Sequence, residues 1–69
     1  DDAVFGDLLR AVDENVHGAD RDAIFAAIQS MQDNRGSDGF KRSYQDFIAS
    51  AAAHMGIIAP FLPAISQML

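Results

Sequence analysis

Residues 47–69 read FIASAAAHMGIIAPFLPAISQML and contain no charged side chain, whereas every Asp, Glu, Lys and Arg of the chain lies between Asp1 and Asp46. A segment without charged residues has no band of solvated side chains to face water. Most of its surface must therefore be buried in a core, in a partner or in a membrane. We expect residues 1–46 to form the cover for this segment.

The length and composition predict one small domain over residues 1–69. A domain of this size buries only about 60% of the surface of its unfolded chain, so its stability is marginal when it is alone. The chain has no cysteine, which excludes disulfides and thiolate zinc sites. Close helix packing or association with another chain is then the expected source of stability.

The net charge of −5 argues against a nucleic-acid partner, because phosphates would be repelled. It also argues against electrostatic attraction to anionic lipid, and it favours a protein partner. Asp1 and Asp2 stand where a secretory signal would carry positive charge, so a cytoplasmic location is expected. The chain begins without methionine, from which we expect it to be excised from a longer chain.

Helical periodicity in the first half predicts two helices, over about residues 2–17 and 21–34. The apolar stripe of the first has the spacing i, i+3, i+4, i+7 and i+11: Phe5, Leu8, Leu9, Val12 and Val16. Gly18 and Gly36 follow the two predicted ends, where a left-handed residue is common. Asp20 is the expected N-cap of the second helix. The short connection between these two helices predicts that they pack as antiparallel neighbours.

Two further helices are predicted over about residues 38–55 and 60–68, with a bend at 56–60. The longer one begins after Ser37, a candidate N-cap. Its apolar stripe consists of Phe40, Tyr44, Phe47, Ile48, Ala51 and Met55. Pro60 is tolerated in the first turn of a helix but costs about 3 kcal/mol in the interior, which places the bend before it.

These four short helices, with no alternating strand pattern, predict an all-α fold arranged as a small antiparallel bundle. The core is expected to contain apolar residues from the first three helices. They are Phe5, Leu9, Ile28, Phe47 and Ile48.

No residue pattern indicates catalysis, a cofactor or a metal, and we expect the protein not to be an enzyme. His54 has no nucleophile and acid grouped with it in sequence, so a hydrogen-bonded structural histidine is the favoured interpretation. Tyr44 lies on an apolar stripe and is expected to bury its ring and leave its hydroxyl at the edge. The loop at 33–39 has two glycines but no lysine or preceding strand typical of a phosphate-binding loop.

The uncharged segment favours a non-catalytic module for protein–protein interaction or oligomerisation, because contiguous apolar surface on a small protein usually marks association. Self-association is the expected form. The predicted interface residues lie after Asp46 on the last two helical stretches. They are Ile57, Phe61, Ile65, Met68 and Leu69.

Two alternatives remain open. The first is an acidic inhibitor or antitoxin-like protein that covers a basic site on its partner, with affinity that falls with salt. Its contacts would be Asp7, Asp13, Glu14, Asp20 and Asp22. The second is a membrane-associated helical protein, since the uncharged segment would reach about 34 Å as one helix. Its prolines, its polar residues and the absence of a flanking cation make a membrane the less favoured partner.

Overall fold

The computed structural model describes residues 3–69, and this part of the chain forms helices joined by turns, with no strand. Three regular helices are followed by a helical C-terminal segment made of short pieces. The regular helices are α1 (Ala3–Asn15), α2 (Gly18–Asn34) and α3 (Phe40–Ser50). The short pieces are η1 (Ala52–His54), α4 (Met55–Ile58), η2 (Ala59–Phe61) and α5 (Leu62–Ser66). The predicted all-α class is confirmed.

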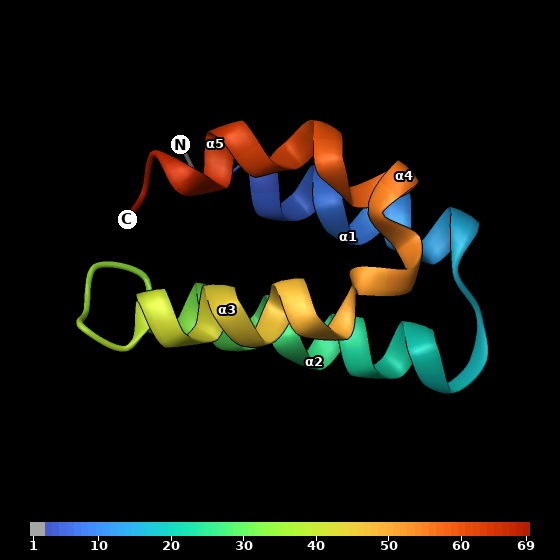
Figure 1. The fold of residues 1–69 in the computed structure, drawn as a ribbon, viewed down its shortest axis with the longest axis horizontal. Coiled ribbons are helices and arrows are strands. Elements are labelled where there is room, and N and C mark those ends of the chain that lie inside the picture. The colour runs from blue at the N-terminus through green and yellow to red at the C-terminus, as the bar shows by residue number, and fades with distance from the viewer. Residues whose placement is uncertain (1–2) are drawn as a thin grey trace.

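The helices lie in two layers (Figure 1). In that view α2 and α3 form the lower layer, and α1 and the C-terminal segment form the upper one, with the chain reversing direction from each helix to the next. The molecule measures 30 × 19 × 16 Å. Each layer can therefore bury only one of its faces, the face that packs against the other layer.

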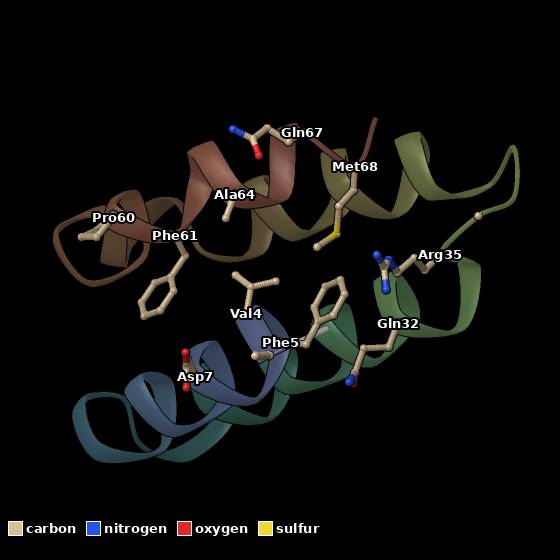
Figure 2. Close-up of a pocket in the computed structure, with 12 residues that line it drawn as sticks. Val4, Phe5, Asp7, Gln32, Arg35, Pro60, Phe61, Ala64, Gln67 and Met68 are labelled. Atoms are coloured by element: carbon tan, nitrogen blue, oxygen red, sulfur yellow. The ribbon is translucent and has the colours of Figure 1, made fainter. Parts of the chain in front are cut away.

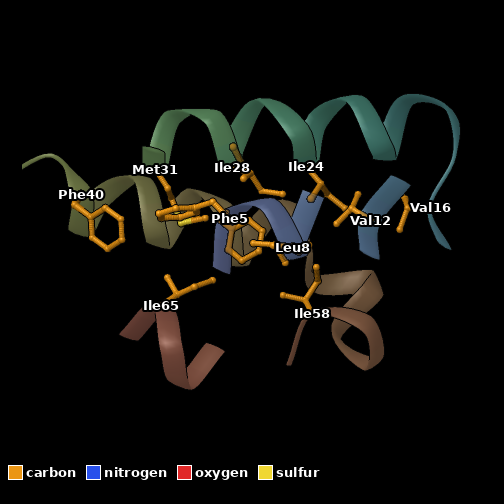
Figure 3. Packing of buried hydrophobic residues seen from close by; sticks show 13 residues of the cluster. Phe5, Leu8, Val12, Val16, Ile24, Ile28, Met31, Phe40, Ile58 and Ile65 are labelled. Atoms are coloured by element: carbon orange, nitrogen blue, oxygen red, sulfur yellow. The ribbon is translucent and has the colours of Figure 1, made fainter. Parts of the chain in front are cut away.

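The core lies between these layers and takes residues from every helix except the two short 3₁₀ pieces. Phe5, Ile28 and Phe47 are fully buried, as predicted, whereas Leu9 and Ile48 are half-buried at the edge of the core. Figure 3 shows side chains of the C-terminal segment extending toward α1. These are Ile58 and Ile65, both without accessible surface.

Glycine reverses the chain at both helix connections. Gly18 and Gly36 have positive φ values of 71° and 83°, a conformation that side chains with a Cβ rarely adopt. The positive φ of Gly18 lets α2 begin at once, at residue 18 rather than at the predicted 21. Asp20 therefore lies in the first turn and is not the N-cap, so that prediction was wrong. The predicted start of the first helix, at residue 2, lies outside the described residues.

The connection between α2 and α3 also differs from the prediction. The hydroxyl of Ser37 donates a hydrogen bond to the carbonyl oxygen of Asn34 at 2.7 Å, so it closes the end of α2. Helix α3 begins only at Phe40 and has no side-chain cap. Ser37 is thus not the N-cap of the third helix, because its hydroxyl is already engaged by the preceding helix.

The bend lies earlier than predicted. Helix α3 ends at Ser50, and the helical direction then changes by 64° at the break before Ala52. The predicted continuous helix over 38–55 is wrong in its last turn. Helical turns then continue from Met55 through Pro60 to Ser66, without the predicted start at 60. Proline lacks a backbone N–H, and 3₁₀ turns around Pro60 accommodate this loss.

The chain covers its uncharged segment more completely than the composition suggests. Among residues 3–69, the single large apolar residue that is mostly exposed is Leu69, at 58%. The outer face of the C-terminal segment consists instead of small or polar side chains. It includes Ala52, Ala53, Ala59, Pro60, Pro63, Ala64, Ser66 and Gln67. The large apolar side chains of this segment are therefore mostly covered by the core and by residues 3–46.

Candidate protein interface

The five predicted interface residues occupy three different environments. Ile65 has no accessible surface and belongs to the core of its own chain. Ile57, Phe61 and Met68 are half-buried and pack against that core. Leu69 is mostly exposed. Ile65 consequently has a packing role in the monomer, and the other four retain surface that another molecule can contact.

An open groove of about 1260 Å³ runs between the start of α1, the end of α2 and the C-terminal segment (Figure 2). We call it the α1–α5 groove. Its apolar wall includes Val4 and Phe5 from α1 and Phe61 and Met68 from the C-terminal segment. Figure 2 shows the Phe61 ring and the Val4 side chain facing the space between the two layers. The fold therefore brings two of the predicted residues together, but Ile57 and Ile65 do not line this groove.

The rim of the α1–α5 groove is polar. Among residues 3–69 it carries one acidic and one basic side chain, Asp7 and Arg35, together with Gln32 and Gln67. The small side chains Ala3 and Ala64 lie on opposite walls. Sequence patterns did not single out the residues from the first half of the chain as groove residues. Only their place beside the last helix in the fold brings them to it.

A smaller pocket of about 380 Å³ lies at the same end of the molecule. The loop 36–38 and the start of α3, with Phe40 and Lys41, form one side of it. Met68 and Leu69 form the other. Met68 lines both hollows, so the exposed Leu69 side chain lies next to the α1–α5 groove.

Acidic side chains gather at the opposite end of α1 and α2, around the connection between these helices. Two nitrogens of Arg21, Nε and Nη2, each lie 2.8 Å from Oδ1 of Asp13, and Nη1 lies 3.5 Å from Oδ1 of Asp22. The guanidinium also lies 4.1 Å from the centre of the Phe25 ring, a cation–π contact. Because one arginine contacts two carboxylates, this end of the molecule remains acidic.

His54 and Tyr44 each make one contact across the fold. Nε2 of His54 lies 3.1 Å from Oδ2 of Asp20, which joins the turn after α3 to the first turn of α2. The hydroxyl of Tyr44 lies 3.1 Å from that of Ser66, which joins α3 to α5. Neither pair lines a hollow described above. Both pairs hold the C-terminal segment to the other layer.

A polar cluster between α2 and α3 is fully hydrogen-bonded. Ser43 is only 5% exposed, and its hydroxyl lies 3.1 Å from that of Ser30. Nδ2 of Asn34 donates to the Ser43 hydroxyl at 3.1 Å and to the Ser30 carbonyl at 2.8 Å. Gly39 leaves room for this amide, since a Cβ there would lie 2.7 Å from Asn34 Oδ1. The cluster fixes the pairing of the two helices, because a buried polar group without a partner is costly.

Among residues 3–69, no group of three or more histidine, cysteine or acidic side chains is arranged to hold a metal ion. Within the same residues no single helix is long and apolar enough to cross a bilayer. The helical stretches Phe40–Ser50 and Ala52–Ser66 meet that criterion only when taken together across their 64° bend.

Comparisons with known proteins found no family model, no curated protein and no solved structure that matches the chain.

Proposed function

We propose that the protein is a non-catalytic interaction module that binds a second copy of itself through the α1–α5 groove. The observation that carries this proposal is the position of the uncharged segment, which forms one wall of a groove that residues 3–69 leave open. Residues 47–69 can pack against another surface without removing any charged side chain from water. Desolvation of a charge is the largest free-energy cost of burying polar groups.

The distribution of charge favours a second copy as the occupant. The whole chain carries −5, but the part of the groove rim formed by residues 3–69 carries one charge of each sign. The acidic group around Asp13, Asp20 and Asp22 lies at the other end of α1 and α2. Two copies that meet groove to groove keep these acidic ends apart. A twofold pairing of this kind uses the same surface on both partners.

The contacts would come from half-buried apolar side chains. Phe61 and Met68 on one wall and Val4 on the other have surface left to bury, and Leu69 extends the apolar area beside them. Ala64 permits a close approach of a neighbouring helix because its side chain is small. Ile57 also has surface left to bury, but it does not line this groove.

Sedimentation velocity at protein concentrations from about 1 μM to 1 mM tests the proposal, a range that covers the affinities expected of a weak interface. Ala64→Glu places a charge on the groove wall at an exposed position, so the monomer should still fold. We expect it to weaken association at least about tenfold, which corresponds to roughly 1.4 kcal/mol. Ala26→Glu, an exposed alanine of α2 outside the groove, is the matched control.

A protein that stays monomeric throughout that range would overturn the proposal. Equal weakening by Ala64→Glu and Ala26→Glu would also contradict it, because general charge repulsion would then explain the effect. Raising the salt concentration separates apolar docking from the alternative of an acidic inhibitor, since binding through surface charges weakens steeply with salt. Arg21 already contacts two carboxylates of the acidic set, those of Asp13 and Asp22, which reduces the charge that this end offers a partner.

A further inference from the structure

We propose that the break at Ala51 is a hinge, and that the C-terminal segment can leave its own chain and take the same place on a second copy. The product is a domain-swapped dimer in which α3 continues as a straight helix beyond residue 51. This inference concerns the core of the molecule and does not rest on docking through the α1–α5 groove.

The first support is that nothing in the local sequence requires the break. Residues 49–53 read ASAAA, and alanine is the strongest helix former. Yet Ala51 has φ −97° and ψ 7°, and His54 has φ −125° and ψ 29°, both far from helical values. Gly56 and Pro60, the residues that locally disfavour a helix, come only after the bend. The bend is therefore imposed by contacts made elsewhere in the fold.

The second support is where those contacts are made. Ile58 and Ile65 insert between the layers, and Figure 3 shows them directed toward Leu8 and Phe5 of α1. The polar contacts of this part of the chain, His54 to Asp20 and Tyr44 to Ser66, also have partners that precede residue 51. Every one of these partners exists on a second copy. A swapped segment can therefore make the same contacts.

The equilibrium between the monomer and the domain-swapped dimer then depends on the conformation of the hinge at Ala51. In the swapped form Ile58 and Ile65 keep their contacts in the core, while the alanines around residue 51 change their packing and gain regular helical hydrogen bonds. The straight helix extends from residue 40 to about residue 58, since Pro60 does not allow it to continue without a disturbance. Dimerisation costs translational and rotational entropy, because two molecules become one. High protein concentration offsets this cost and favours the dimer.

Distance measurements by pulsed electron paramagnetic resonance test the hinge directly. The chain has no cysteine, so Lys41→Cys and Leu69→Cys give two unique sites for spin labels. These side chains line the same small pocket in the monomer. In a straightened chain their separation would rise toward a limit of about 42 Å, at 1.5 Å per helical residue. Labelled chain is refolded at high concentration with a tenfold excess of unlabelled chain, so that only distances within one chain are recorded.

We expect the dimer fraction to show the long distance within each labelled chain and the monomer fraction to show the short one. A dimer that keeps the short distance would overturn the swap and would support association through the groove instead. Failure to form any dimer after refolding at about 1 mM would also overturn it. The distance measured within a dimer thus separates failure of the hinge from failure of the groove, whereas the absence of any dimer would contradict both.

A hinge variant provides the second measurement. Ala52→Gly with Ala53→Gly weakens an uninterrupted helix and should lower the dimer–monomer equilibrium constant at least about tenfold. Both alanines are exposed, so the packed core is not altered. Ala23→Gly with Ala26→Gly makes the same change at exposed positions of α2 and is the matched control. An equal decrease in both variants would contradict the role of the hinge.

Discussion

The paired helices α2 and α3 and the C-terminal segment are both helical, but they are stabilised differently. The pair carries almost all the features that a sequence can specify locally, including apolar stripes and charged outer faces, and it contains a hydrogen-bonded polar cluster. The C-terminal segment has no charged face and consists of short helical pieces. Its position depends on two fully buried isoleucines, on partly buried apolar side chains packed against the core and on two polar contacts. A helical segment with few local signals can therefore obtain its shape from long-range contacts.

The largest expected effect compares two fully buried isoleucines. Ile28→Ala, in α2, should lower the free energy of unfolding by about 4 kcal/mol, and Ile65→Ala, in α5, by about 2 kcal/mol. The difference is expected because α2 is packed between α1 and α3, whereas α5 borders an open groove and can relax into the space. Urea denaturation followed by circular dichroism measures both values. Equal losses would show that the two regions are equally rigid.

A smaller effect is expected at the turn that joins α2 to α3. Gly36 has φ +83° and open space where a Cβ would lie, so Gly36→Ala tests the backbone conformation alone. We expect a loss of about 1–2 kcal/mol in the free energy of unfolding. A loss near zero would mean that the turn changes conformation at no cost. The turn between α3 and the C-terminal segment contains no glycine of positive φ. Among residues 3–69, glycines of positive φ therefore occur in the first half of the molecule.

Two other glycines should give the opposite sign. Gly6 lies in α1 and Gly56 in α4, neither has positive φ, and a Cβ would meet no atom within 4 Å at either. Gly6→Ala should raise the free energy of unfolding by about 0.5–1 kcal/mol, as in a regular helix interior. Gly56→Ala should raise it less, because α4 is only four residues long. A larger gain at Gly56 would indicate that the C-terminal segment is limited by helix propensity rather than by packing.

The smallest expected effect concerns the polar contact between the layers. Tyr44→Phe keeps the ring and removes the hydroxyl that lies 3.1 Å from Ser66. Because this contact is exposed, we expect a loss of about 0.5 kcal/mol or less. A double-mutant cycle with Ser66→Ala isolates the pair. Coupling well above 1 kcal/mol would show that this hydrogen bond, and not the buried isoleucines, holds α5 in place.

Sequence reasoning identified only part of the candidate interface. Phe61 and Met68 line the groove as residues with exposed apolar surface, and Leu69 lies beside it. Ile65 fits the same helical stripe as Phe61 and Leu69, but it is buried in its own chain. Periodicity finds the apolar side of a helix and cannot tell which molecule covers that side. The opposite wall, with Val4 and Asp7, is formed by residues more than 50 positions away along the chain.

The helical class, the apolar stripes of the first three helices and the two glycine turns follow from local sequence, because each depends on residues within one or two helical turns. The position of the bend after α3 depends instead on tertiary contacts. The residues around Ala51 favour a continuous helix, and the bend exists because it lets Ile58 and Ile65 reach the core. Burial of two large side chains outweighs the loss of a few helical hydrogen bonds, and that balance depends on contacts distant in sequence.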